Sequence, residues 1–506
     1  MKKITLLNYL CSAILFFAFM PIANAQLENT NWYFGNQTGL NFNDGTLPPT
    51  ILTDNMMSTI GGTATVSDDT GNLLFYTNGI DVWNNTHSLM PNGTGLLGST
   101  TVSQSVVVVP KPDDANKYYI ITNQGEDFGS VGLSYSVVDM TADGGSGDID
   151  PLTKNINLQL TSSEKLTTIL NPSDNTYWLV SFAPSTDPAN SDTFYSYKID
   201  NNGINLFTQS TFSFQFPANP DNTGGQMKIS PDGLNIALTH NTKKIETITV
   251  LDSRGNIISQ DTGITGAEGL YRFDFNSADG TVTLFRNFFF IPLDVLNYHG
   301  LEFSPDSNLL YVSTTDTYQY LDTVGTPVGR LYQVDYRHDD QQIQTTKIFE
   351  GLNPIYGIQA GINGKIYSVN STGNLSTIHT PIIPGFGANY AHEDLNLSGL
   401  ATKELPQTVP EVFVSATLPK NYLPKKPVLQ GNPFKDEVMF KFKFIQTYTI
   451  EFYNSMGLLV KNVIYDDMTN RRIYKINTTD LPTDTYYLII RDEHSQIWYE
   501  TTLKIE

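Results

Sequence analysis

One sequence motif recurs along the chain. It consists of a run of alternating apolar residues, a short turn rich in Pro, Asp, Asn and Gly, and a second β-rich run. Its clearest copies are "TATVSDDTGNLLFYT" (63–77), "QMKISPDGLNIALT" (226–239), "GLEFSPDSNLLYVS" (300–313) and "GIQAGINGKIYSV" (357–369). A period of two predicts strands with one packed face, and the turn predicts a tight hairpin. No stretch sustains helical periodicity over three turns, so we expect an all-β chain.

The hairpins recur at wide and fairly regular intervals. The predicted turns lie at Gly71, Asn116, Asn175, Gly233, Ser307 and Gly364. The widest interval also holds "YRFDFNSADGTVTLF" (271–285), which we expect to form an outer strand pair of the same unit. Repeats of this kind, each long enough to form about four strands, are typical of the blades of a β-propeller.

The two ends of the repeat region complete one another. The segment "NWYFGNQTGLNFN" (31–43) predicts a hairpin, and "PEVFVSA" (410–416) predicts a single strand. Joined, they would form a composite seventh blade that closes the ring and removes exposed sheet edges. The predicted fold of residues 26–416 is therefore a seven-bladed β-propeller, with six or eight blades as the alternatives.

The first 25 residues have the features of a secretory signal peptide. Lys2 and Lys3 precede an apolar run, and Ala23-Asn24-Ala25 precedes Gln26. Small residues at these positions predict cleavage between Ala25 and Gln26. An N-terminal membrane anchor is the alternative, but no charged stop follows the apolar run. No later stretch is apolar over the roughly 20 residues that span a bilayer, so we expect no transmembrane segment in the mature chain.

The only cysteine, Cys11, lies inside this predicted leader. The residues before it do not form a lipoprotein cleavage box. A mature chain that begins at Gln26 would therefore contain no disulfide, no thiolate zinc site and no cysteine nucleophile.

Charge is distributed unevenly along the chain. Residues 26–419 contain 16 Lys and Arg against 40 Asp and Glu, whereas residues 420–506 contain 12 against 11. Because so acidic a body repels phosphate backbones, we expect no nucleic-acid partner. The change near residue 420 indicates a domain boundary, and the Pro- and Lys-rich stretch 417–430 is typical of an extended linker.

Residues 431–506 contain six further β-rich runs, which predict a small immunoglobulin-like β-sandwich. In the first of them, Val438, Phe440, Phe442 and Phe444 alternate with charged or polar residues. This alternation predicts one face in a core and one in water.

Four segments of this C-terminal unit form an ordered pattern: "GNPFKDEVMFKF" (431–442), "YTIEFYNSMGLLVK" (448–461), "INTTDLPTDTYYLII" (476–490) and "LKIE" (503–506). In this pattern the unit resembles the type A sorting domain of the type IX secretion system of Bacteroidota. The residues that match the family pattern are Asn432, Pro433, Gly457, Leu481, Pro482, Tyr486 and Lys504. Asp484 and the acidic end, Glu506, depart from it.

The resemblance implies that the type IX machinery is a partner of this chain. It implies export through the periplasm to the outer-membrane surface or the medium, followed by removal of the sorting domain. The alternative is a spacer domain of the same fold without a sorting role.

The body is similar to a WD40-like or YVTN-type propeller family of secreted Bacteroidota proteins. The similarity is carried by residues 31–45, 66–98, 135–149 and 300–313, and it covers most of residues 31–416. It implies a fold and an extracellular location, but no single activity, because propellers host binding, scaffolding and catalysis alike.

No catalytic residues are predicted in the body. "SDDTGNLL" (67–74) fits an Asp-box only in part, and arginines that could bind a sialic acid carboxylate are few. The histidines form no H-x-H or H-E-x-x-H pattern, and no G-x-S-x-G motif occurs. Those considered are His87, His240, His299, His338, His379 and His392.

One loop is a candidate calcium site. "TADGGSGDID" (141–150) offers the carboxylates of Asp143, Asp148 and Asp150 around flexible glycines. Its spacing matches neither an EF-hand nor a nonapeptide repeat, so a glycine-rich turn with solvated acids is favoured. No other cofactor is expected.

The sequence therefore predicts a secreted or cell-surface propeller and favours a binding or adhesion module over an enzyme. Its ligand would be a glycan or a protein, held by long loops at one end of the central channel. One alternative is a carbohydrate-active enzyme, a glycosidase or a lyase, in which carboxylates of different blades converge roughly 5–10 Å apart. The other is a purely structural surface protein.

Overall fold

The computed structural model describes most of the chain after the predicted leader. The described residues are 27–43, 48–112, 114–125, 132–171, 174–186, 190–217, 224–240, 244–251, 257–265, 269–288, 297–316, 319–320, 323–324, 328–336, 344–409, 428–429, 436–441, 448–454, 458–465, 473–491 and 497–505. No α-helix occurs among them, and the short 3₁₀ helices are η1 (Leu27–Asn29), η2 (Asp143–Gly145) and η3 (Gly385–Ala388). The prediction of an all-β chain is confirmed.

The chain divides into two units. The larger, which we call the body, comprises Met1–Ile378 and Ala391–Val412. The smaller, the C-terminal unit, comprises His379–Tyr390 and Phe413–Glu506.

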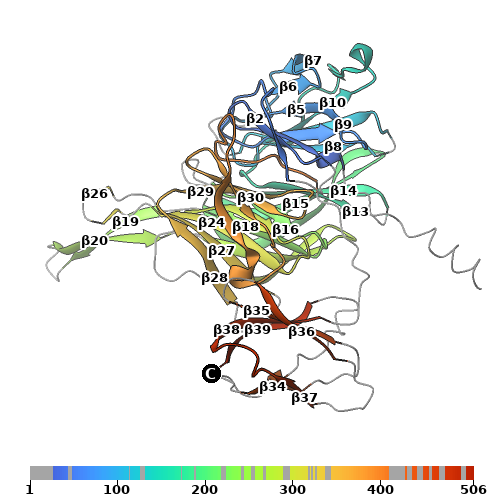
Figure 1. Ribbon diagram of the computed structural model, residues 1–506. Helices are drawn as coiled ribbons and strands as arrows, with labels where there is room; N and C mark the ends of the chain where they lie inside the picture. The colour runs from blue at the N-terminus through green and yellow to red at the C-terminus, as the bar shows by residue number, and fades with distance from the viewer. Residues whose placement is uncertain are drawn as a thin grey trace, which may run out of the picture. The chain divides into compact units, whose positions relative to one another are not determined.

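Seven small antiparallel sheets follow one another along the body (Figure 1). The first contains β1 (Asn31–Phe34), β2 (Thr38–Asn41) and β3 (Thr50–Leu52). The second contains β4 (Ala64–Ser67), β5 (Leu73–Thr77), β6 (Asp81–Asn84) and β7 (Leu89–Thr94). The third contains β8 (Val106–Pro110), β9 (Lys117–Asn123), β10 (Leu133–Asp139), β11 (Asp148–Ile149) and β12 (Ile156–Gln159).

The remaining four sheets have four strands each. The fourth contains β13 (Leu166–Asn171), β14 (Thr176–Ala183), β15 (Asn190–Asp200) and β16 (Gly203–Pro217). The fifth contains β17 (Met227–Ile229), β18 (Asn235–His240), β21 (Gly269–Asn276) and β22 (Thr281–Phe288). The sixth contains β23 (Asn297–Phe303), β24 (Leu309–Asp316), β27 (Val328–Asp335) and β28 (Gln344–Gly351). The seventh contains β29 (Ile355–Ala360), β30 (Ile366–Asn370), β31 (Leu375–Ile378) and β32 (Tyr390–Leu395).

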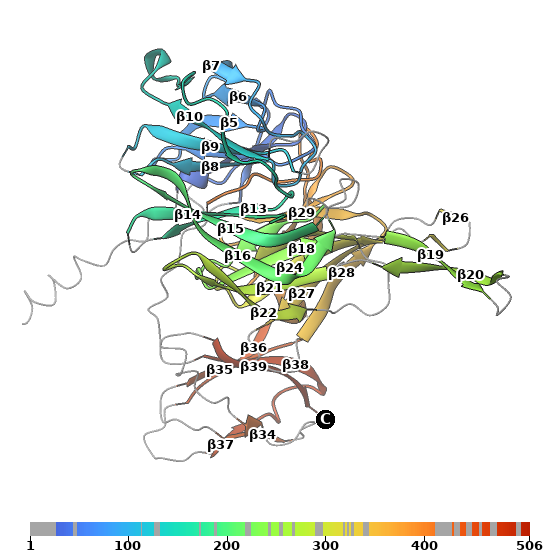
Figure 2. The ribbon, with the colours of Figure 1, turned by 180° about the vertical axis from the view of Figure 1, so that it is seen from behind.

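Two hairpins are inserted between the second and third strands of neighbouring sheets. The fifth sheet carries β19 (Lys244–Leu251) and β20 (Ile257–Thr265), and the sixth carries β25 (Gln319–Tyr320) and β26 (Thr323–Val324). The strands of each hairpin pair only with each other in the described structure. Figures 1 and 2 show β19 and β20 projecting away from the sheets of the body.

Each of the six predicted turns connects the first two strands of a sheet. The first strand pairs antiparallel with the second across every one of them. In the β4–β5 turn, Gly71 has φ +86°, and the Asp68 carboxylate accepts the N–H groups of Thr70 and Asn72. Burial raises the pKa of Asp68, but these hydrogen bonds outweigh it and hold that pKa below its usual value.

Several inner strands of the body are buried on both faces, and not on one as the alternation predicts, whereas outer strands such as β7 and β32 are largely exposed or partly buried. Every residue of β18 and of β30 is buried. The physical reason is that each sheet packs between two others. Polar residues at the alternate positions, such as Thr239 and Ser368, are therefore enclosed as well.

Shared apolar clusters join successive sheets. One cluster contains residues of the first and second sheets, and further clusters join the second to the third, the third to the fourth, the fourth to the fifth and the fifth to the sixth. β29 of the seventh sheet lies against β23 and β24 of the sixth. A last cluster brings Trp32 and Phe42 of the first sheet region against Tyr367 and Val369 of the seventh.

The predicted composite blade is described only in part. β1 and β2 form the expected hairpin, and β3 adds a third strand from the chain just after it. The segment 410–416 lies outside the described residues. What meets the first sheet is the chain just before that segment, because Asn36 forms a β-bridge with Leu400.

The C-terminal unit contains two antiparallel sheets. One has the order β33 (Val428–Leu429), β34 (Glu437–Lys441) and β37 (Ile473–Asn477), and the other β36 (Leu459–Tyr465), β35 (Tyr448–Tyr453), β38 (Asp484–Arg491) and β39 (Ile497–Ile505). Tyr486, Leu488 and Ile490 of β38 are buried on one face of the strand, and Ile489 on the other face is buried as well. The six predicted strands of this unit are all present.

Candidate functional site

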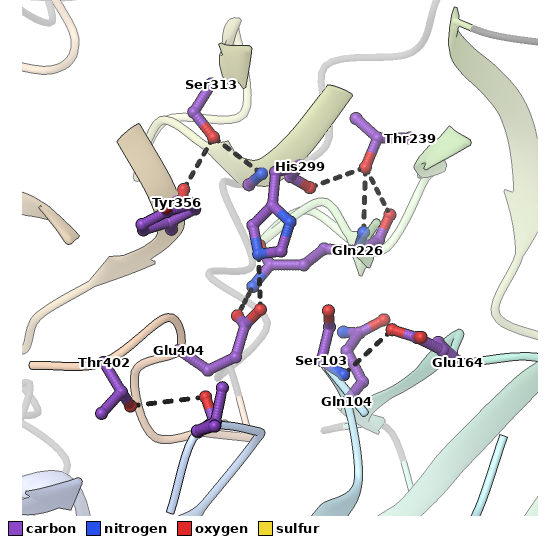
Figure 3. Close-up of polar contacts among 12 residues, drawn as sticks. Ser103, Gln104, Glu164, Gln226, Thr239, His299, Ser313, Tyr356, Thr402 and Glu404 are labelled. Carbon is purple, nitrogen blue, oxygen red and sulfur yellow. Dashed lines mark hydrogen bonds and ion pairs between the residues drawn. The ribbon is translucent and has the colours of Figure 1, made fainter. Parts of the chain in front are cut away.

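Polar residues of several sheets gather where the first strands begin (Figure 3). We call this edge of the sheets the leading edge and define it by Gln104, Glu164, Gln226, His299 and Tyr356. Each lies just before or near the start of β8, β13, β17, β23 and β29 respectively. In an antiparallel sheet, the start of the first strand and the link between the second and third strands lie at the same edge.

The segment 400–409, which we call the central segment, follows the seventh sheet and contacts six others. Its Leu400 exchanges two backbone hydrogen bonds with Asn36 of the first sheet region, at 2.8 and 3.1 Å. The N–H of Gln407 donates to the carbonyl of Thr63, beside β4, at 2.8 Å. Val409 belongs to the apolar cluster that joins the third and fourth sheets.

The central segment is also fixed to the seventh sheet. The N–H of Gly357 donates to the carbonyl of Lys403 at 2.8 Å, and the side-chain amide of Gln359 donates to Thr408 Oγ1 at 3.0 Å. A Cβ atom at position 357 would lie 2.6 Å from Glu404 Oε2 and 2.7 Å from the Lys403 carbonyl oxygen. Only glycine permits so close an approach of the two backbones.

Glu404 is the centre of the polar group. Its side chain is 1% exposed, and its Oε1 atom lies 2.6 Å from Nε2 of His299. Its Oε2 atom accepts a hydrogen bond of 2.7 Å from Nε2 of Gln226. Gln226 Oε1 in turn accepts the N–H of Leu301 at 2.9 Å, which fixes the orientation of the amide. The Glu404 carboxylate therefore accepts hydrogen bonds from side chains of both the fifth and the sixth sheets.

Gln104 performs the same linking role for three sheets, one of which, the fifth, it shares with Glu404. Its Oε1 atom accepts the N–H groups of Met227 and Leu166, at 2.7 and 3.2 Å, and its Nε2 atom donates to the Met227 carbonyl at 2.9 Å. Beside it, the N–H of Ser103 donates to Glu164 Oε2 at 3.0 Å. Gln104 thus joins the third, fourth and fifth sheets at the leading edge.

A second buried polar group lies about two residues further along the first strands. Lys228 Nζ lies 3.2 Å from Glu302 Oε2 and 2.5 Å from Gln359 Oε1. The N–H of Ala360 also donates to Glu302 Oε2, at 3.0 Å. Because a buried ion pair needs further hydrogen bonds to offset its desolvation, this group is a structural link between three sheets.

The structure does not bring the three calcium candidates into one group. Asp143 begins η2, whereas Asp148 begins β11 and accepts a hydrogen bond from Asn92 at 3.0 Å. Asp150 accepts the N–H of Leu152 at 2.9 Å within its own turn. Within the described part of the chain, no three His, Cys, Asp or Glu side chains are grouped so that they could hold a metal ion. Calcium binding here stays a prediction.

Four of the seven sorting-signal residues fall in the described structure. Leu481 and Pro482 lie in the turn between β37 and β38, where the Leu481 N–H donates to Thr478 and the Pro482 carbonyl accepts the Tyr486 hydroxyl at 2.7 Å. Burial raises the pKa of Tyr486, and nearby Asp484 and Asp480 add to this effect. Lys504 pairs with Thr485 across β38 and β39. Asn432, Pro433, Gly457 and the cleavage residues Ala25 and Gln26 lie outside the described residues, as does His338.

Sequence reasoning did not identify the leading-edge group. His299 and Glu404 are separated by 105 positions, and neither belongs to a motif. The repeat itself was the only available indication, because it predicts that the starts of the first strands converge. It could not show that residues 400–409 would lie among them.

The C-terminal segment matches a known family. Residues 431–502 match the model of the secretion system C-terminal sorting domain. No curated protein is similar enough to this chain to match it. None of the helices in the described structure is long and apolar enough to cross a membrane.

Several solved structures are distantly similar. Hydrazine synthase of Kuenenia stuttgartiensis has 15% identity, covering 63% of this chain and 74% of its own, with a TM-score of 0.35. The extracellular domain of a putative hybrid two-component system of B. thetaiotaomicron has 12% identity, covering 94% of this chain and 55% of its own, with a TM-score of 0.33. An ulvan lyase has 10% identity, covering 75% and 86%, with a TM-score of 0.36. At such TM-scores, these likenesses say nothing of this chain's activity.

The family match confirms the sorting domain that the sequence pattern implied. It supports export by the type IX secretion system and a location outside the cell or on its surface. The chain thus carries a secretion system C-terminal sorting domain at residues 431–502.

Proposed function

We propose that the body is a seven-bladed β-propeller that binds a glycan or protein ligand after export by the type IX system. The observation that carries this proposal is the convergence of six sheets on the central segment at one polar edge. Packing of each sheet against the next, and of the seventh region against Trp32, supports closure of the ring. The predicted signal peptide would bring the chain to the periplasm first.

The longest insertions support a binding role for the leading edge. β19 and β20 follow the end of β18, and the N–H of Thr239 in β18 donates to the Gln226 carbonyl at 2.9 Å. The inserted hairpin therefore leaves the fifth sheet beside Gln226. The β25–β26 hairpin leaves the sixth sheet at the equivalent edge. Long loops around a polar centre are the usual setting of a propeller's ligand site.

The arrangement favours binding over glycoside hydrolysis. Glu164 and Glu404 come from different parts of the chain and lie in the same region (Figure 3). Both Glu404 oxygens, however, are engaged by neighbouring side chains, and the carboxylate is buried. A glycosidase needs a second carboxylate that is free to act as an acid, base or nucleophile. A carbohydrate-active enzyme is therefore the alternative function. The binding assay would detect it through oligosaccharides released from the polysaccharide.

Export is tested by deleting residues 420–506 in a type IX-competent host. The truncated chain should accumulate in the periplasm, whereas the full chain reaches the surface or the medium. Protease accessibility on intact cells distinguishes the two locations. Surface display of the truncated chain would contradict the role of the sorting domain.

Binding is tested with the chain from Gln26 to Glu506 on arrays of polysaccharides and of extracellular proteins. We expect a saturable ligand, with no shortening of any polysaccharide that binds. Released oligosaccharides would favour the enzyme. No ligand on either array would favour a purely structural surface protein.

A further inference from the structure

We infer that His299 is a ligand-binding residue whose Nδ1 atom accepts a hydrogen bond from a saccharide hydroxyl at the leading edge. This inference rests on the proposed binding function and names the ligand class and the atom that recognises it. It follows from how the two nitrogens of the imidazole are used.

The hydrogen bonds around Glu404 fix the tautomer of His299. The Leu301 N–H occupies Gln226 Oε1, so the amide of Gln226 presents its Nε2 hydrogens to Glu404 Oε2. With Glu404 as a carboxylate, both of its oxygens accept, so Nε2 of His299, 2.6 Å from Glu404 Oε1, carries the hydrogen between them. In the neutral imidazole, Nδ1 is then an acceptor with a free lone pair.

That Nδ1 atom is unpaired. It has no hydrogen-bond partner among the residues that the structure describes, and the His299 side chain is 16% exposed. Figure 3 shows the dashed line from the His299 ring running from Nε2 to Glu404. A buried carboxylate therefore holds the ring through one nitrogen and leaves the other for a ligand.

His87 shows the opposite arrangement in the same body. Its Nε2 lies 3.1 Å from Asp54 Oδ2, and its Nδ1 lies 3.3 Å from the Tyr76 hydroxyl. Both nitrogens are occupied, so His87 has a structural role between the first and second sheets. The comparison makes His87 the matched control for His299.

The neighbours of His299 suit a polyhydroxylated ligand. Tyr356 packs edge-on against His299, with ring centroids 5.8 Å apart, and is only partly buried. The exposed Lys403 ammonium lies 5.9 Å from the same tyrosine ring. An aromatic ring beside a directed acceptor and a flexible donor recognises the apolar face and the hydroxyls of a sugar together. We therefore place a saccharide here, and not a protein.

The test compares His299→Gln with His87→Gln in the chain from Gln26 to Glu506. Glutamine at position 299 can still donate to Glu404 through its Nε2 atom but has no atom equivalent to Nδ1. The probes are two neutral polysaccharides, laminarin and xylan, and two polyuronates, polygalacturonate and alginate, with an extracellular protein array in parallel. The two polysaccharide arms distinguish neutral from acidic sugars.

We expect at least one polysaccharide to bind the parent chain and the H87Q variant. The H299Q variant should bind this polysaccharide at least about tenfold more weakly. A tenfold increase in Kd corresponds to roughly 1.4 kcal/mol, which is the contribution expected of one hydrogen bond. The unfolding temperature of H299Q should stay close to that of the parent. Diethyl pyrocarbonate, read by mass spectrometry, should modify His299 in the parent chain, and bound saccharide should slow the reaction at His299 but not at His87.

Four results would overturn the inference. Equal affinity of H299Q and the parent would show that Nδ1 takes no part, and bound saccharide that leaves the modification of His299 unchanged would show that the ligand lies elsewhere. Binding to proteins but to no polysaccharide would refute the saccharide while leaving the proposed binding function intact. No binding on either arm would refute both.

Discussion

At the scale of single residues, the body depends on charged groups that are buried and fully engaged. Glu404 accepts from Gln226 and His299, and Glu302 pairs with Lys228. Removing one partner of such a pair leaves an uncompensated buried charge or donor. This lowers the free energy of unfolding by more than the loss of a surface pair does. Sequence reasoning could not identify these partners, because the contacts join residues that are 74 to 178 positions apart.

Replacing Glu404 with alanine should destabilise the body by about 3–5 kcal/mol. The substitution leaves both the Gln226 amide and the His299 Nε2 donor without their acceptor. Urea unfolding followed by circular dichroism measures the change. The control is Lys198→Ala, which removes a more exposed pair with Asp174 and should cost about 1 kcal/mol or less. Equal effects of the two substitutions would contradict the central position of Glu404.

Replacing Gly357 with alanine should separate the central segment from the seventh sheet. The new methyl group would meet Glu404 Oε2 and the Lys403 carbonyl at distances that no real Cβ tolerates. We expect a loss of about 1–3 kcal/mol, typical of overpacking. Alanine at Gly364, where an added Cβ would meet no atom within 4 Å, tests turn strain alone. A Gly357→Ala protein as stable as the parent would show that the two backbones are further apart.

Buried tyrosines predict a loss of stability at high pH. Burial raises the pKa values of Tyr76, Tyr118 and Tyr367 to about 12, from the ordinary 10. The unfolded chain therefore releases these protons first, so stability is complete below pH 10 and falls as the pH rises toward 12. The last part of the rise in absorbance at 295 nm should coincide with the change in circular dichroism. Ionisation of all the tyrosines near pH 10 in a still folded protein would contradict the burial of these three.

At the scale of elements, the hairpins were predictable and the insertions were not. The conformation of a turn such as "SPDG" can be predicted from its residues. The Asp232 carboxylate accepts a hydrogen bond from the Leu234 N–H, and Gly233 takes φ +68°. The strand β19 has the same alternation as a strand of the main sheets. Local pattern does not say which partner a strand will take, so the β19–β20 hairpin could not be separated from the fifth sheet in advance.

Replacing residues 244–265 with a short Gly-Ser link should leave the body folded. β19 and β20 pair only with each other in the described structure, so their removal leaves the ladders of the fifth sheet intact. We expect the unfolding temperature to change by a few degrees at most, and ligand binding at the leading edge to weaken. Loss of cooperative unfolding would show that the hairpin is part of the fifth sheet's core.

At the scale of the whole molecule, sequence reasoning recovered the sorting domain because four segments keep its pattern in order. The repeated hairpins likewise predicted a series of small sheets. The role of residues 400–409 was missed, since the stretch has little β pattern and its contacts are spread over all seven sheets. Its course is set by tertiary contacts such as Leu400–Asn36 and Val409 with the third and fourth sheets.

The central claim is that the chain after the seventh sheet returns to the first sheet and closes the body. Asn36 and Leu400 exchange backbone hydrogen bonds in an antiparallel pair, a geometry with Cα atoms about 5.5 Å apart that a disulfide can bridge. Both side chains are exposed. Asn36→Cys and Leu400→Cys can be combined in the chain from Gln26, which has no other cysteine.

The most direct measurement is disulfide formation in this double variant, with each single variant as a control. The account predicts an intramolecular bond on mild oxidation, seen as faster migration on a non-reducing gel. It also predicts a higher unfolding temperature than in the reduced form, because the bond closes a loop of several hundred residues. A double variant that stays reduced, or that forms only intermolecular dimers like the single variants, would contradict closure of the body at this point.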